Sequence, residues 1–399
     1  MNFSDKNIYP DSWSSFMSDS LNDLKSKGLY RKFRVLDNSV STRVNIDNRT
    51  VVLFSSNDYL GLASDLRMKE ASSKAALSWG TGSGASRLIS GNTTLYTKLE
   101  EAVASFKKSE SALVFPSGYS ANAGVISSLA QEGDLILSDA LNHASIIDAC
   151  KLTKAKVVTY PHCDTDFVKD YLDNSQKQKR VLVVTDGVFS MTGELAPIPQ
   201  LCKICKQYGV LLMVDDAHGT GVTGPEGRGT LDYYNLNEPG IVQVGTFSKA
   251  LGGLGGFVAG SNLLIDYIIN HARSLIYSTA LPPSVLASDC EGIRIISEDS
   301  SLRIKLFELI HQLRDGLVSL GFPVFPVPMP IISILIGDVS ETLSVAQYLW
   351  DKGLYVPPIR PPTVMPGESC LRISLSALNS AEDIERLLWA IKAYYKKGS

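Results

Sequence analysis

The chain has 399 residues, of which 44% are hydrophobic and 20% charged, and its net charge is -3 at pH 7. This composition is typical of a globular protein with a sizeable core, and it excludes a disordered or fibrous chain. The small negative charge gives no reason to expect nucleic acid or a membrane surface as a partner.

The N-terminus predicts a cytoplasmic protein. Met1–Lys6 lack the basic start and apolar run of a secretory signal, and no stretch approaches the ~20 apolar residues that cross a bilayer. Cys202 and Cys205 form a CxxC, but without a second pair we interpret them as small buried helix residues. The five histidines lack zinc-ligand spacing, so no metal is expected.

The first hundred residues predict two helices and a strand. Residues 11–28 carry apolar side chains at helical intervals, which indicates an amphipathic helix that needs a surface to lie on. Residues 50–54 predict a strand that ends in the turn Asn57–Asp58. Residues 80–91 hold four glycines, which favours a tight turn or a close backbone contact, and residues 95–106 return to helical spacing.

A strand over residues 112–116 runs into Ser117 and Gly118, and a helix of small residues follows through Leu129. A helix that begins here offers free N–H groups and a positive dipole end, which suit a phosphate. Ser117 could equally be only the N-cap of that helix, and both interpretations stay open.

Regular alternation of strands and helices follows. Most of the strands are continuous apolar runs, which is typical of a parallel sheet covered on both faces. The sequence therefore predicts an α/β domain through about residue 285. The expected strands are 134–138, 156–160, 180–185, 209–214, 241–245 and 256–259.

Polar residues stand where several of these strands end, at the edge of the sheet where ligands of open α/β folds bind. Lys249 lies between strand 241–245 and the glycine-rich return before strand 256–259. Alone it would be an ordinary surface lysine; desolvated in a crevice, it would be an amine nucleophile toward a carbonyl. The other strand-end residues are Asp139, Asn142, His143, Asp186, Ser190, Asp215, Asp216 and His218.

The last third predicts a smaller α+β domain. A helical segment over residues 284–320 precedes a strand at 331–337, a helix, a proline-rich loop at 357–364 and a strand at 371–375. We expect three parts: an N-terminal helical segment (1–50) packing with the small domain or a dimer, a large domain (51–285) and a small domain (286–399).

The strand-end residues match the needs of pyridoxal 5'-phosphate. Its aldehyde needs an amine, its ring nitrogen a carboxylate, its hydroxyl a hydrogen-bond donor, its ring a flat partner and its phosphate N–H and hydroxyl groups. This sequence supplies all five.

Six motifs, in order, give the chain a specific resemblance to the α-oxoamine synthases, which have the aspartate aminotransferase fold (fold type I). That fold implies a mostly parallel central sheet in a large α/β domain plus a smaller α+β domain. The motifs are Ser56–Leu62, Gly84–Leu88, Phe115–Tyr119, Gly187–Met191, Asp215–Gly219 and Thr246–Lys249.

The resemblance implies roles for individual residues. Lys249 would form the Schiff base and move the α-proton, Asp215 would pair with the ring nitrogen and His218 with the ring hydroxyl. His143 would stack on one ring face and Ala217 on the other. The remaining cofactor-binding residues would be Ser117, Gly118, Tyr119, Asp186, Thr246 and Ser248, with Ser278 and Thr279 reaching the cofactor of the second subunit of a homodimer; Asn57, Arg31, Ser190, Thr363 and Arg372 would face the substrate.

The resemblance also implies a reaction. Arg360–Val364 is most similar to the members that condense L-alanine with a pimeloyl thioester, carried by CoA or a carrier protein, in biotin synthesis. Another α-oxoamine synthase, an aminotransferase and a non-catalytic partner subunit are the alternatives. Residues that differ from the usual family pattern are Tyr96, Asp186, Thr192, Cys370 and Asn379.

Overall fold

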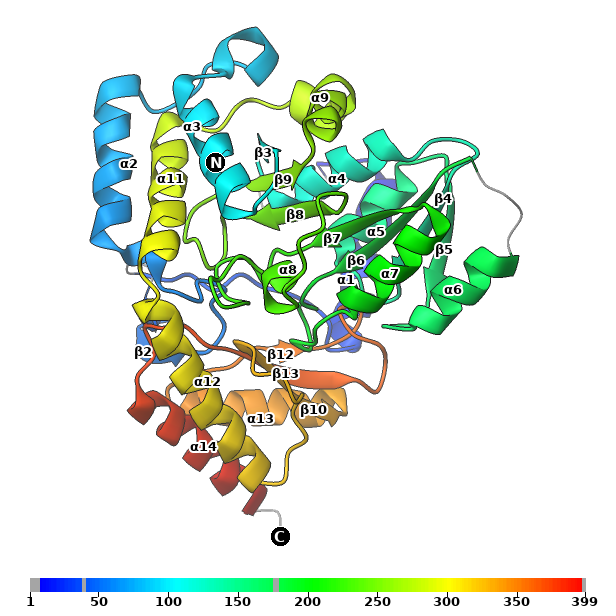
Figure 1. The fold of residues 1–399 in the computed structure, drawn as a ribbon. Helices are drawn as coiled ribbons and strands as arrows, with labels where there is room; N and C mark the ends of the chain where they lie inside the picture. Colours follow the sequence, from blue (N-terminus) through cyan, green and yellow to red (C-terminus); the bar gives the residue numbers. More distant parts are fainter. Residues whose placement is uncertain (1–7, 38–40, 175–178, 397–399) are drawn as a thin grey trace.

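A seven-stranded sheet forms the centre of the computed structural model, which describes residues 8–37, 41–174 and 179–396 (Figure 1). The strand order is β3-β9-β8-β7-β6-β4-β5, and β9 alone runs antiparallel to both of its neighbours. The predicted mostly parallel sheet is therefore confirmed. Its strands are β3 (Ser111–Phe115), β4 (Leu135–Asp139), β5 (Lys156–Tyr160), β6 (Val181–Asp186), β7 (Leu211–Asp215), β8 (Val242–Thr246) and β9 (Gly256–Gly260).

Helices cover both faces of this sheet, which explains why its strands are continuously apolar. One face carries a core built with α4 (Gly118–Leu129), α5 (Ala144–Lys151), α9 (Asn262–His271) and α10 (Arg273–Ile276). The opposite face carries α6 (Thr165–Asn174), α7 (Ile198–Tyr208) and α8 (Thr230–Tyr233). Cys202 and Cys205 are buried in α7 as free thiols, as expected.

A third group of helices lies beside strand β3. In it, α11 (Pro283–Glu298) packs against α2 (Leu66–Trp79) and α3 (Thr94–Phe106). The predicted helical segment 284–320 is thus two helices, α11 and α12 (Ser301–Ser319). The glycine-rich segment forms a single turn of π-helix, η2 (Arg87–Gly91), and η1 (Leu62–Ser64) is a short 3-10 turn.

The C-terminal part is a small α+β unit. Its antiparallel sheet has the order β10-β13-β12, and α12, α13 and α14 accompany it (Figure 1). A separate sheet, β1-β2-β11, joins the first strands of the chain to this part, since β2 pairs in parallel with β11. The bounds are β1 (Arg43–Ile46), β2 (Arg49–Leu53), β10 (Ile331–Gly337), α13 (Val339–Asp351), β11 (Leu354–Tyr355), β12 (Pro358–Ile359), β13 (Ser369–Ser374) and α14 (Ala381–Lys396).

The predicted N-terminal helix is present as α1 (Asp11–Ser26). None of its residues is buried, and Trp13 and Phe16 keep 60% and 66% of their surface exposed. Residues 1–7 of the proposed N-terminal part lie outside the described residues, and the proposed boundaries at 50 and 285 remain predictions. No helix in the described ranges is both long and apolar enough to span a bilayer.

Candidate active site

Lys249 lies in the return between β8 and β9, at the C-terminal edge of the sheet. Backbone hydrogen bonds close this return, from Phe247 N to Gly255 O (3.1 Å) and from Gly253 N to Phe247 O (2.8 Å). Burial lowers the pKa of Lys249 from its usual value, although the Asp215 and Asp186 carboxylates oppose this shift. This shift makes the neutral amine, which is the nucleophilic form, easier to reach than in water.

Asp215 ends strand β7 and is held by two donors. Its Oδ2 accepts a hydrogen bond from Asn122 Nδ2 at 2.6 Å, and its Oδ1 accepts one from Ala217 N at 3.0 Å. Asn122 comes from the buried face of α4 and also donates to Ser145 Oγ at 2.8 Å. These two donors fix the orientation of the Asp215 side chain, which can then pair with a basic ring nitrogen. Sequence reasoning assigned no role to Asn122, although an asparagine inside a helix of small apolar residues is a signal for one.

His218 follows Asp215 and is 6% exposed. Its Nδ1 lies 2.6 Å from the hydroxyl oxygen of Tyr59, a fully buried residue. Burial and then the charge of Lys249 hold the pKa of His218 well below 6.5, so the imidazole is neutral. Tyr59 is the second residue of the site that sequence reasoning left without a role.

His143 is the N-cap residue of α5, and its backbone N–H donates to Asp186 Oδ2 at 3.0 Å. Burial lowers the pKa of His143, so a neutral, flat ring is available for stacking. Burial and then the charge of Asp215 raise the pKa of Asp186 well above its usual value. Asp186 thus positions the turn that carries His143.

The N-terminus of α4 supports both interpretations of Ser117. Its Oγ accepts from Ser120 N at 3.0 Å, so it is an N-cap, as the simpler interpretation predicted. Thr246 nevertheless lies against the same helix start: a Cβ added to Gly118 would be 3.3 Å from Thr246 Cβ. Thr246 Oγ1 is 2.8 Å from Ser248 Oγ. Hydroxyl groups and the dipole of a twelve-residue helix therefore converge on a place that suits a phosphate.

Arg372 on β13 brings the small unit to this edge of the sheet. Its Nε donates to Ser190 O at 2.6 Å, and its Nη2 donates to Asn57 Oδ1 at 3.3 Å. Arg372 is 7% exposed. A nearly buried guanidinium beside Asn57 and Ser190 is suited to a substrate carboxylate.

The remaining predicted residues lie at the surface. Arg31 Nη2 donates to Thr363 Oγ1 at 3.3 Å, and both side chains are exposed. Tyr119 is half exposed and donates to Asp148 Oδ2 at 2.7 Å. Thr279 is exposed and pairs with Ser86 in a β-bridge.

Ser278 and Thr279 do not belong to the set of hydroxyl-bearing residues at the start of α4. In the described part of the chain, no hydrogen bond links either of them to Ser117 or Thr246. Their predicted role at the cofactor of a second subunit stays a prediction.

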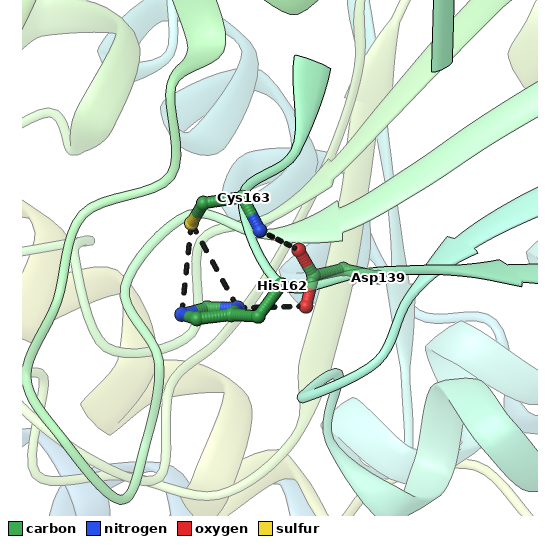
Figure 2. A group of neighbouring side chains, drawn as sticks. All are labelled: Asp139, His162 and Cys163. Carbon is green, nitrogen blue, oxygen red and sulfur yellow. Dashed lines mark hydrogen bonds and ion pairs between the residues drawn. The ribbon is translucent and has the colours of Figure 1, made fainter. Parts of the chain in front are cut away.

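A second polar cluster lies at the ends of β4 and β5 (Figure 2). Ligand atoms of Asp139, His162 and Cys163 lie within 4.8 Å of one another, which is close enough for a metal ion. His162 Nδ1, however, is 2.8 Å from Asp139 Oδ1, and its Nε2 is 3.1 Å from Glu194 Oε2.

Burial alone would lower the pKa of His162, but its hydrogen bonds to Asp139 and Cys163 outweigh burial and raise it to about 10. An imidazolium has no lone pair for a metal, so this cluster is better described as a cation between two carboxylates.

The side chains at the sheet edge fit pyridoxal 5'-phosphate. A partly buried amine, an anchored carboxylate and a neutral imidazole lie near one another at this edge of the sheet, and hydroxyl groups meet a helix N-terminus beside them. These groups correspond to the aldehyde, the ring nitrogen, the ring hydroxyl and the phosphate.

Known proteins resemble the chain over nearly its whole length. The aminotransferase class I and II family model matches residues 49–391. The 8-amino-7-oxononanoate synthase 2 of Bacillus subtilis (strain 168) is 46% identical over 378 residues, which are 95% of this chain and 96% of that protein. The 8-amino-7-oxononanoate synthase of Geobacter sulfurreducens is 45% identical over 93% of this chain and 95% of its own length.

Solved structures give the same fold. A serine palmitoyltransferase from S. paucimobilis, with a bound PLP-myriocin aldimine, has a TM-score of 0.91 at 30% identity and covers 97% of this chain and 98% of its own. The 8-amino-7-oxononanoate synthase of Francisella tularensis has a TM-score of 0.76 at 28% identity, covering 87% of this chain and 98% of its own.

Proposed function

The chain belongs to the aminotransferase class I and II family, and on this basis we propose that it is a pyridoxal phosphate-dependent enzyme of biotin synthesis. It condenses L-alanine with a pimeloyl thioester, with loss of CO2 and of the thiol, to give 8-amino-7-oxononanoate. The observation that carries this proposal is full-length likeness to 8-amino-7-oxononanoate synthases, together with a sheet edge at which Lys249, Asp215, His218 and Arg372 lie near one another.

Each residue around the cofactor has its own role in the reaction. Lys249 would attach the cofactor and, once free, would move the α-proton of alanine, because burial lowers the pKa of its amine. When bound, the cofactor supplies an electron sink for the α-carbon. Asp215 keeps the proton on the ring nitrogen, and His218 donates to the ring hydroxyl. His143 and Ala217 would hold the ring from its two faces.

The residues around the site bind the cofactor phosphate and the two substrates. Ser117, Gly118, Tyr119, Thr246 and Ser248 hold the phosphate at the start of α4. Asp186 supports the cofactor site through the turn of His143. Arg372 binds the alanine carboxylate with Asn57 and Ser190 beside it, and Arg31 and Thr363 lie on the side where the acyl thioester enters.

The working unit is a homodimer in this proposal, with Ser278 and Thr279 completing the phosphate site of the second subunit. The exposed position of Thr279 supports this assignment. The protein acts in the cytoplasm, and the acyl donor is a CoA or carrier-protein thioester.

A second candidate is an α-oxoamine synthase that uses serine with a longer acyl chain. The observation that favours it is the higher TM-score to serine palmitoyltransferase, 0.91 against 0.76. Identities of 46% and 45% to 8-amino-7-oxononanoate synthases, against 30% to the palmitoyltransferase, place it second.

The test is a matrix of substrates. The protein, loaded with pyridoxal phosphate, is incubated with alanine, glycine or serine. Each amino acid is combined with an acetyl, pimeloyl or palmitoyl thioester of CoA or of carrier protein. The masses of the products are then measured. We expect the mass of 8-amino-7-oxononanoate from alanine and a pimeloyl thioester. A faster reaction with serine and a palmitoyl thioester would support the second candidate, and keto acid formed from alanine without thioester would indicate an aminotransferase.

A further inference from the structure

Tyr59 is a buried tyrosine that forms a hydrogen bond with His218. It is 0% exposed, and its hydroxyl oxygen is 2.6 Å from His218 Nδ1. We propose that Tyr59 is a positioning residue: it donates its proton to Nδ1 of His218 and thereby fixes the proton of the imidazole on Nε2. This inference rests on the proposed function for the assignment of His218 to the ring hydroxyl of the cofactor.

The neutral state of His218 makes the choice of nitrogen matter. Burial disfavours a second proton, and the charges of Lys249, Arg372 and His143 disfavour it further. A neutral imidazole has one donor and one acceptor nitrogen, and the partner of one nitrogen decides the role of the other. Only the tautomer with its proton on Nε2 leaves Nδ1 as an acceptor for Tyr59.

The phenol of Tyr59 is a donor at every pH where the enzyme works. Burial raises its pKa to about 12, with Arg372 opposing that rise. Its single proton has two acceptors within reach, His218 Nδ1 at 2.6 Å and Asn57 Oδ1 at 3.3 Å. Asn57 Oδ1 already accepts from Arg372 Nη2. The shorter contact and the free acceptor both direct the proton to His218.

The proton of Tyr59 is therefore assigned to His218 Nδ1, and Asn57 Oδ1 accepts from Arg372 Nη2 instead. In the opposite tautomer, Nε2 would be an acceptor and could not donate to a ring oxygen. Tyr59 thus acts on the cofactor only through His218, which separates a positioning role from simple packing.

The first measurement uses the protein without cofactor, so its outcome does not depend on the proposed function. Nitrogen chemical shifts of 15N-labelled histidine report the tautomer of His218, assigned by its loss in His218→Gln. We expect one tautomer with the proton on Nε2 in the wild type, and a mixture in Tyr59→Phe, which removes a single oxygen. Tyr267→Phe is the matched control, because it removes a hydroxyl that donates to Ser128 O on α4, away from the crevice.

The second measurement is a pH titration of the visible absorption of the bound cofactor. Loss of a donor to the ring oxygen makes the chromophore more basic, so the titration midpoint in Tyr59→Phe moves upward by about one pH unit, while Tyr267→Phe matches the wild type. If Tyr59→Phe is unstable, replacement of Tyr59 by 3-fluorotyrosine keeps the shape and gives a stronger donor. Its midpoint then stays at or below that of the wild type.

Unchanged His218 shifts and an unchanged midpoint in folded Tyr59→Phe would overturn the proposal, as would an upward shift with 3-fluorotyrosine. A protein that shows the expected tautomer change but forms no 8-amino-7-oxononanoate would instead contradict the proposed function alone.

Discussion

Two parts of the site are built differently. One is a floor at the edge of the central sheet, and the other is an exposed rim formed by Arg31 and Thr363. The floor comprises Lys249, Asp215, His218, His143 and Asn122, of which Asp215, His218 and Asn122 are buried. Hydrogen bonds of 2.6 to 3.0 Å join Asp215 to Asn122 and Ala217, His218 to Tyr59 and the backbone of His143 to Asp186. At the rim, the exposed Arg31 and Thr363 meet at 3.3 Å. Buried groups cannot exchange their partners for water, whereas exposed groups can at little cost. We therefore expect the floor to set the chemistry of the reaction and the rim to influence the choice of acyl chain.

The sharpest test of this contrast is Lys249→Ala. The floor then lacks its amine, and we expect turnover to fall by at least about 10⁴-fold. Product formation is measured with alanine and a pimeloyl thioester. Lys203→Ala, an exposed lysine on α7, is the control and should keep normal turnover. Substantial product from Lys249→Ala would mean that the floor is not the reaction centre.

A smaller loss is expected for Asp215→Asn, which keeps the shape of the side chain but removes its charge. Turnover should fall by about 10²–10³-fold, because the charge that holds the ring proton is gone. Asn122→Ala removes only one donor to that carboxylate and should cost roughly tenfold. The exposed Asp170→Asn is the control. Equal losses in Asp215→Asn and Asn122→Ala would contradict this graded arrangement.

Arg372→Lys tests the arginine proposed to bind the substrate carboxylate, which belongs to neither the floor nor the rim. A lysine cannot keep the three hydrogen bonds of this guanidinium, so we expect KM for alanine to rise about 10- to 100-fold with a smaller change in kcat. Initial rates over a range of alanine concentrations separate the two constants. A loss confined to kcat would assign Arg372 to the chemistry rather than to binding.

His162→Gln affects stability rather than turnover. The raised pKa of His162 means that its charge stabilises the fold fully below pH 6.5 and that this contribution is lost as pH rises through about 10. The variant should melt a few degrees below the wild type at pH 6, and the difference should narrow above pH 10. Thermal melts at both pH values are the measurement, with the exposed His311→Gln as control. A difference in melting temperature that does not change with pH would contradict the ion pairs of His162 with Asp139 and Glu194.

The smallest effect is expected at the rim. Arg31→Ala removes an exposed contact and should raise KM for the acyl thioester no more than about fivefold, with kcat unchanged. The neighbouring exposed Lys32→Ala is the control for lost charge. A large fall in kcat would erase the distinction between floor and rim.

Much of the large domain could be predicted from sequence because its strands are continuous apolar runs and its polar residues follow them directly. The ends of β6, β7 and β8 lie together as that pattern required. The same reasoning could not identify Asn122 and Tyr59, because their roles depend on partners 93 and 159 positions away along the chain.

The cluster of His162 was also missed. It joins Asp139 to Glu194, two residues that no local motif connects. Short edge strands such as β11 and β12, two residues each, are similarly set by long-range pairing and not by their own sequence pattern.

The closed return between β8 and β9 limits how the chain can change in length. Because β9 is antiparallel to β8, residues 247–255 are tied to the sheet at both ends, and a Cβ on Gly252 would lie 2.2 Å from Ala63 N. Loops between parallel strands and their helices can lengthen without moving the strands. One added residue here would shift Lys249 away from Asp215, so insertions should be tolerated almost anywhere at the surface before they are tolerated in this nine-residue segment.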